Sequence, residues 1–476
     1  MVSLFISLYL LLTILIGFWA AKRVKNSEDY MIAGKNLPAF IVGVTIFSTW
    51  FGSEMIMGVP GYFVQEGAQA LIIDAGGGTL CLLIVAFFFV RPIYRLNILT
   101  VNDFFKMRYG KRVETITSLI LILSYFSWVA SQLLALAYIF ESLYNWPVNM
   151  GVVVAAGIVV LYTYVGGMWA VSLTDLIQAV VMVLGLGYIL FVLNQQTEGL
   201  LKVISDQKEG FFNLFPESGF INWTNHLYLW MIFGFGSIVS QEIYQRVLAA
   251  KSEKKARNGV FIGAFFMFFV GIVPSLIGLL IYTIHPELIE SNDGQNLLPA
   301  MVTEYFSIPV QIIFLGALIS AILSTSSGAV LAPATVFAEN LIKSNRTNLT
   351  DQQLLLTTRI SVILMALISG GYTYFNDSIH SLVVNSVTLI TVSMTFPFIL
   401  GIYWSKSSVS GAWFGIIGGA TVWFGALLWG TAIEPTLWGV VASLICMVSG
   451  SLLLPDNSHL KFLKETNNGH SRSHKG

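Results

Sequence analysis

Long apolar runs separated by short polar stretches dominate the pattern of hydrophobic and polar positions along this chain. An α-helix needs about 20 residues to cross the hydrocarbon core of a bilayer, and most of these runs reach that length. We therefore predict an all-α membrane protein with thirteen transmembrane helices. The predicted helices span approximately residues 3–20, 37–64, 66–90, 115–143, 148–166, 168–194, 224–247, 257–285, 306–342, 357–375, 378–403, 408–430 and 434–455.

The positions of lysine and arginine support this number of helices. Cytoplasmic loops of membrane proteins carry an excess of these residues. With the N-terminus outside and the sides alternating, 23 of the 25 Lys and Arg residues fall on the cytoplasmic side, and only Lys202 and Lys208 lie outside. A wrong number of helices would mix the two sides. We therefore expect a multi-pass protein of the plasma (inner) membrane with a cytoplasmic C-terminus.

Composition agrees with this class and narrows the partners. The chain is 55% hydrophobic and only 11% charged, with a mean hydropathy of +0.76, whereas a soluble domain is about one quarter charged. The net charge of zero gives no indication of a nucleic-acid partner. Cys81 and Cys446 both lie in predicted helices, so no disulfide framework is implied. We expect no enzyme, a lipid bilayer as surroundings, and a monomer or weak dimer.

The segment from Gly316 to Ala334 is unusually rich in small and hydroxyl residues for a membrane helix. One interpretation is packing, since small residues at every fourth position let another helix approach closely. The other is a cation site, in which the adjacent hydroxyls of Ser324 and Thr325 join free carbonyls of a broken neighbouring helix. The two interpretations are compatible. The small residues of the stripe are Gly316, Ser320, Ser324, Gly328 and Ala332.

Two predicted helices contain breaks. The helix at 37–64 holds Gly52, Gly58 and Pro60, and glycine and proline at membrane depth free backbone carbonyls. A second break falls at 234–237 in the helix at 224–247. The two broken helices lie five helices apart and run in opposite directions, which is typical of an inverted-topology repeat in a secondary transporter.

This repeat divides the chain into six parts. They are a first helix and cytoplasmic loop (1–36), a first repeat of five helices (37–194), an extracellular loop (195–223), a second repeat of five helices (224–403), two C-terminal helices (404–456) and a cytoplasmic tail (457–476).

Two carboxylates fall within the apolar segments. Glu54 lies in the first broken helix, near the middle of the bilayer, and Asp74 stands in the next helix. A charge at such a depth costs several kcal/mol, so it faces a wet cavity or a partner. For Glu54 a purely structural pair is the alternative to a role in binding.

Three motifs in order, VGGMWAVSLTDLIQ, QRVLAAKS and SAILSTSS, resemble those of the sodium:solute symporter family. The resemblance implies a LeuT-type core of five plus five helices, with one helix before it and two after it. It also implies that Asp175, in the TD motif, lies on the intracellular side of the sodium path. The implied Na⁺ ligands are the carbonyls of Ser48, Phe51 and Ala321 and the hydroxyls of Ser324 and Thr325.

Within that family, Trp50 and Trp128 resemble two tryptophans of the high-affinity choline transporters, where they surround a quaternary ammonium. Cation–π attraction is the physical reason. A third tryptophan of that branch aligns with Ser240, and the proline branch has an aspartate where this chain has Trp50. The resemblance and the two carboxylates lead us to expect a solute-binding set of Trp50, Glu54, Met55, Asp74, Trp128, Phe233, Ser237 and Gln241.

The leading hypothesis is Na⁺-coupled import, by alternating access, of a small organic solute with a positive nitrogen. Choline, a betaine or an amino acid such as proline would meet this description. The alternatives are a Na⁺-coupled symporter of a sugar, a monocarboxylate or pantothenate, and, in different classes, a transporter-like sensor or a channel.

Overall fold

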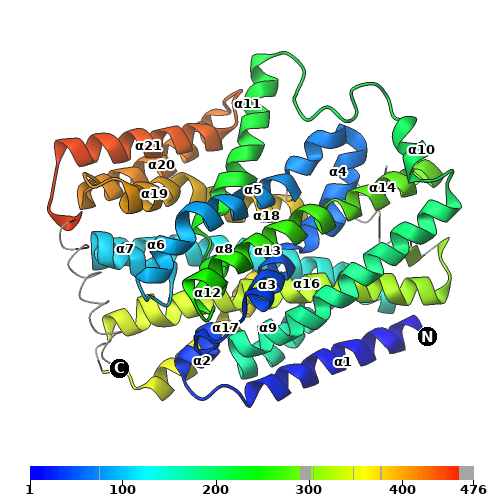
Figure 1. Ribbon diagram of the computed structural model, residues 1–476, viewed down its shortest axis with the longest axis horizontal. Coiled ribbons are helices and arrows are strands. Elements are labelled where there is room, and N and C mark those ends of the chain that lie inside the picture. Colours follow the sequence, from blue (N-terminus) through cyan, green and yellow to red (C-terminus); the bar gives the residue numbers. More distant parts are fainter. Residues whose placement is uncertain are drawn as a thin grey trace.

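The structure is a computed structural model that describes residues 1–73, 75–289, 298, 302–303, 305–346, 348–375, 378–459 and 462. Within these residues every regular element is a helix. Most of the long helices run roughly along the long axis of the molecule (Figure 1). The last two helices, α20 (Val409–Trp429) and α21 (Pro435–Leu453), pair with each other at the edge opposite α1 (Val2–Ala21).

All thirteen predicted segments contain helical residues, but they do not all form single long helices. Among the described residues, nine helices are long and apolar enough to cross a membrane, or ten if one bent pair counts as a span. The chain is therefore a multi-pass membrane protein, and thirteen spans stay a prediction. Further helices of the fold, spanning or not, are α2 (Ser27–Ile32), α5 (Ala75–Ile84), η4 (Val85–Phe89), α6 (Val90–Arg95), α7 (Val101–Tyr109), α8 (Lys111–Tyr144), α10 (Leu200–Ser205), α14 (Val273–Ile284), α17 (Asp351–Tyr372), α18 (Ile379–Ser393) and α19 (Thr395–Tyr403).

Most of the difference between the predicted and the observed number of long helices arises because some predicted spans are joined and others are divided. Two predicted spans are joined in α9 (Val148–Gln196), which changes direction at Gly167. Another predicted span is divided, because α3 (Ala39–Trp50) ends after only 12 residues. Length and apolarity therefore identify where the chain is helical, while breaks and kinks decide how many helices are counted.

The first predicted break is present, and the second falls at Ser240, just after the predicted 234–237. Beyond α3, Phe51 leaves helical geometry with φ −81° and ψ 71°, and the chain resumes as η2 (Glu54–Gly58) and α4 (Val59–Glu66). The second break follows α11 (Phe220–Leu229), η5 (Trp230–Phe235) and η6 (Gly236–Val239). There Ser240 is extended, with φ −66° and ψ 126°, and a new helix, α12 (Gln241–Leu248), begins directly after it.

Small residues bring α3 against α13 (Glu253–Gly271). A Cβ atom added at Gly43 would lie 2.6 Å from the Ile262 side chain, and one added at Gly259 would lie 2.5 Å from Val42. Glycine at both positions therefore permits a helix contact that a side chain would block. This contact supports the helix that ends at the first break.

The helix that carries the hydroxyl-rich segment is enclosed by the rest of the fold. In α16 (Ile308–Val336) every residue from Phe314 to Val336 is buried. It packs against α3, α8, α9 and α17, which include helices of both halves of the chain. Any polar group on this stretch must therefore find its partner inside the protein.

Gly167→Ala is expected to lower the stability of the protein. Gly167 has φ 49° and ψ −140°, and an added Cβ would lie 2.5 Å from the carbonyl oxygen of Tyr30. Backbone strain of this kind costs about 1–3 kcal/mol. The temperature at which the purified protein loses its monodisperse elution peak measures the effect. Gly157→Ala in the same helix is the control, because its Cβ would meet nothing within 4 Å; an equal response of both variants would contradict the prediction.

Candidate functional site

Oxygen atoms from three helices meet beside the first break. The Ser324 hydroxyl donates to Oδ1 of Asp175 at 2.6 Å. The Thr325 hydroxyl donates to the carbonyl oxygen of Ser48 at 3.3 Å, and the Ser48 hydroxyl donates to the Asp175 carbonyl oxygen at 3.4 Å. Helices α3, α9 and α16 thus present hydroxyl, carbonyl and carboxylate oxygens to one another in a buried region.

The two other predicted Na⁺ ligands are Ala321, which lies on α16, and Phe51, which directly follows α3. Ala321 stands inside unbroken α16, where its carbonyl accepts the backbone N–H four residues on, and a carbonyl retains a second lone pair. Phe51 follows the last residue of α3, and its non-helical ψ turns its carbonyl away from the helix direction. Carbonyl and hydroxyl oxygens of this kind suit a small hard cation.

A buried arginine lies next to these oxygens. Arg246 and Asp175 form an ion pair, with Nη2 3.7 Å from Oδ2. Their side chains are 1% and 0% exposed, respectively. Nε of Arg246 donates to the Thr45 carbonyl at 3.2 Å, and Nη1 donates to the Glu242 carbonyl at 3.1 Å. Asp175, predicted to lie along the sodium path, is therefore held between α12 and α16.

The two glycines in the small-residue stripe of α16 differ in how closely other residues approach them. A Cβ added at Gly328 would lie 2.7 Å from Arg246 Nη2 and from Thr49 Cγ2. A Cβ added at Gly316 would meet nothing within 4 Å. Close packing and the polar cluster therefore coincide at the Gly328 end, where both interpretations of this segment apply.

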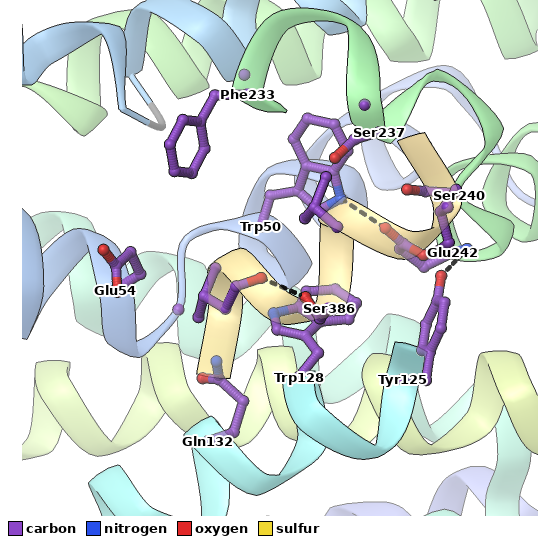
Figure 2. Close-up of a pocket in the computed structure, with 16 residues that line it drawn as sticks. Trp50, Glu54, Tyr125, Trp128, Gln132, Phe233, Ser237, Ser240, Glu242 and Ser386 are labelled. Atoms are coloured by element: carbon purple, nitrogen blue, oxygen red, sulfur yellow. Dashed lines mark hydrogen bonds between the residues drawn. The ribbon is translucent and has the colours of Figure 1, made fainter. Parts of the chain in front are cut away.

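A pocket lies between the two breaks and helices α5, α8 and α18 (Figure 2). Its walls are mainly aromatic and aliphatic, with two carboxylates among them. Five of the eight predicted solute-binding residues line it. The lining consists of Trp50, Gly52, Glu54, Gly78, Tyr125, Trp128, Gln132, Phe233, Gly236, Ser237, Ser240, Glu242, Val383, Ser386, Val387 and Ile390.

The carboxylate of Glu242 lies at the N–H edge of the Trp50 indole. The Trp50 indole N–H donates to Glu242 Oε1 at 3.0 Å, and the Glu242 backbone N–H donates to the Tyr125 hydroxyl at 3.4 Å (Figure 2). Glu242 is 3% exposed, and its Oε2 atom has no hydrogen-bond partner. This pocket residue was not among the predicted ones.

The other carboxylate, Glu54, lies at the opposite end of the pocket in Figure 2 and has a partner on α18. Nδ1 of His380 lies 2.6 Å from Glu54 Oε1. The Glu54 side chain also folds back along its own segment, so that a Cβ added at Gly58 would lie 2.9 Å from its carboxylate. The structural pair considered for Glu54 is therefore present, although the residue also lines the pocket.

Gly52 lies where the pocket meets the oxygen cluster. A Cβ added at Gly52 would lie 2.9 Å both from Gln132 Oε1, in the pocket, and from Thr325 Oγ1, in the cluster. Oε1 of Gln132 also accepts the Ser53 backbone N–H at 3.0 Å, which satisfies one donor freed by the break. Only a residue without a side chain fits between the two groups.

Two other predicted solute-binding residues do not line the pocket, and a third lies outside the described residues. Met55 is 1% exposed, and its sulfur lies towards Gly271 of α13. Gln241 is turned the other way, because its Oε1 accepts the Val101 backbone N–H at 2.8 Å at the start of α7. Asp74 lies outside the described residues.

Comparison with known proteins identifies relatives over most of the chain. The model of the sodium:solute symporter family matches residues 30–419. The human high affinity choline transporter 1 is 27% identical over 452 residues, which cover 87% of this chain and 76% of that protein. A sodium/proline symporter of Staphylococcus aureus (strain bovine RF122 / ET3-1) is 27% identical over 450 residues, which cover 90% of this chain and 86% of that protein.

Solved structures show the same fold. The substrate-bound, outward-open structure of a Na⁺-coupled sialic acid symporter superposes with a TM-score of 0.82 at 19% identity, over 95% of this chain and 98% of that one. Mhp1, a nucleobase-cation-symport-1 family transporter in a closed conformation, gives a TM-score of 0.54 at 16% identity, over 93% and 99% of the two chains. The fold is thus of the LeuT type that the family resemblance implied.

Proposed function

The chain belongs to the sodium:solute symporter family, and on that premise we propose that it imports a small organic solute with a positive nitrogen, coupled to Na⁺ and by alternating access. Membership makes it a transporter rather than an enzyme. Choline, a betaine or an amino acid such as proline belongs to the proposed solute class. We also propose a plasma-membrane location with the N-terminus outside and the C-terminus in the cytoplasm, and a monomer or weak dimer.

Sodium coupling is supported by the oxygens around the first break. The proposed ligands are the carbonyls of Ser48, Phe51 and Ala321 and the hydroxyls of Ser324 and Thr325. The contact between Thr325 and the Ser48 carbonyl brings the two ligand-bearing helices together. A cation between them would be bound by α3 and α16 at once, and a symporter needs such a bridge because its ion must favour one arrangement of the helices.

The single observation that carries the solute class is the pocket wall: indoles beside a carboxylate. Trp50 and Trp128 line it together with Glu242 and Glu54. An indole face attracts a desolvated cation by about 2 kcal/mol, and a nearby carboxylate adds Coulomb attraction. The same groups repel a bare anion.

A thermal-shift screen with the purified protein tests the proposed solute class. Choline, glycine betaine, L-proline, sugars and monocarboxylates are each added in NaCl and in KCl. A ligand that binds only the folded protein raises its stability, by about 2.7 kcal/mol at a hundred times the dissociation constant. We expect an ammonium compound to stabilise the protein in NaCl more than in KCl. Stabilisation only by a neutral sugar or a monocarboxylate would contradict the solute class.

Counterflow of the labelled compound in proteoliposomes then separates a carrier from a channel or a sensor.

Trp50→Ala and Trp128→Ala are each expected to weaken binding of that compound about tenfold, because each removes a face that attracts the cation. Replacing either tryptophan by phenylalanine should weaken binding less, since a phenyl ring keeps part of the attraction for the cation. Competition binding in NaCl measures the dissociation constants. Trp429→Ala is the control, because Trp429 is 88% exposed on α20. Unchanged affinity in both pocket variants would contradict the proposed position of the solute.

A further inference from the structure

We propose that Glu242 is the counter-ion of the transported solute and determines its selectivity for a positive nitrogen. The inference rests on the proposed function, and it assigns the charge recognition to one atom, Oε2 of Glu242. That atom is buried in the pocket wall and has no hydrogen-bond partner. A carboxylate in such surroundings requires a positive or donating group, because a buried charge without a partner is strongly disfavoured.

The carboxylate is held in place by its other contacts. Oε1 accepts the Trp50 indole N–H at 3.0 Å, and Tyr125 and Arg246 bind the backbone N–H and carbonyl of Glu242. Its backbone and one carboxylate oxygen are therefore already engaged, and Oε2 is left for a ligand. The same hydrogen bond fixes the indole ring of Trp50, so the aromatic face and the charge are positioned as a unit.

The protein itself supplies no cation to this carboxylate among the described residues. The nearby guanidinium of Arg246 forms its ion pair with Asp175 and donates to the Thr45 and Glu242 carbonyls, not to the Glu242 side chain. The other pocket acid, Glu54, is paired with His380 at the opposite end. Each carboxylate thus has one oxygen with a protein partner and one, Oε2, without a hydrogen-bond partner. The partners differ in kind, because the histidine beside Glu54 can carry a positive charge, whereas the indole N–H beside Glu242 is a neutral donor. Glu242 therefore has the greater need of a cation from the solute.

The geometry also orients the solute. A positive nitrogen against Glu242 lies beside Trp50 and near Ser240, whose small side chain also lines the pocket. The rest of the solute then extends towards Phe233 and Glu54. A neutral analogue of the same shape would enclose Oε2 without a partner, which the pocket should reject strongly.

Paired probes that differ only in the nitrogen test this assignment. They are choline with 3,3-dimethylbutan-1-ol, glycine betaine with 3,3-dimethylbutanoate, and L-proline with cyclopentanecarboxylate, each assayed by competition binding to the purified full-length protein in NaCl. The wild-type protein is expected to prefer the ammonium member of the pair that it binds by about 30-fold or more. Glu242→Gln is expected to remove most of that preference, and Glu141→Gln, at an exposed glutamate of α8 outside the pocket, is the matched control that should keep it.

The outcomes separate this inference from the proposed function. A wild-type preference that survives in Glu242→Gln overturns the role of Glu242 and leaves the solute class intact. A wild-type protein that binds none of the ammonium compounds overturns the solute class and this inference with it. If Glu242→Gln does not fold, Glu242→Asp is measured instead, because it keeps the charge but withdraws it by one methylene. Its affinity for the ammonium member should fall about tenfold, and an unchanged affinity overturns the inference.

Discussion

Replacing Ser324 and Thr325 together by alanine is expected to abolish Na⁺-stimulated uptake while leaving the protein folded. The double variant removes both hydroxyls that α16 presents to Asp175 and to the Ser48 carbonyl. Two of five proposed ligands would be lost, and carbonyls alone would have to replace the water shell of the ion. The folded state should persist, because Arg246 remains paired with Asp175.

Uptake of the labelled solute into proteoliposomes, with and without a Na⁺ gradient, measures this effect. Ser326→Ala is the matched control, because its hydroxyl donates to the Ile322 carbonyl of the same helix at 2.6 Å. Gel filtration shows whether each variant is folded. A double variant with ordinary sodium dependence would contradict the assignment of the cation site.

The second large effect is expected from Arg246→Met, which should destabilise the protein by about 3–5 kcal/mol. Methionine has a similar length but leaves the buried carboxylate of Asp175 without its cation. It also removes the donors to the carbonyls of Thr45 and Glu242. Because α3 and α12 are joined through these contacts, both breaks should be affected.

Adding Asp175→Asn to Arg246→Met tests the electrostatic cause. The double variant should recover part of the lost stability, since the unpaired charge is gone. Asp175→Asn alone should weaken sodium activation or slow sodium release more than it weakens solute affinity at saturating Na⁺. Thermal unfolding of the four proteins gives the coupling between the two positions. Additive effects would mean that Arg246 acts only through the carbonyls.

Much of the fold was accessible from the sequence because each signal is local. Apolar length marks a membrane helix, and glycine or proline marks a break, so a break in each of two helices could be predicted, although the second lies at Ser240 and not at 234–237. The number of spans was less accessible. Whether Gly167 separates two helices or bends one depends on how the backbone turns at that residue, which hydropathy does not report.

The site was predicted in part, and the missed residue has a physical explanation. A continuous helix from Ser237 would turn Gln241 towards the same side, one turn on. The extended conformation of Ser240 ends that helix and changes the direction in which the following side chains point. Glu242 therefore faces the pocket and Gln241 faces α7. The pairs Glu54–His380 and Asp175–Arg246 join residues far apart in the chain, and only the packing of the helices brings them together.

Gly52 determines how binding of the ion can affect binding of the solute. Its missing side chain leaves a single stretch of main chain as the partition between Gln132 of the pocket and Thr325 of the oxygen cluster. A bound ion and a bound solute would contact opposite sides of one peptide segment. Energetic coupling between the two would then not require a chain of contacts through distant helices. Thermodynamic linkage then sets a strict equality: whatever factor Na⁺ adds to the affinity for the solute, the solute adds to the affinity for Na⁺.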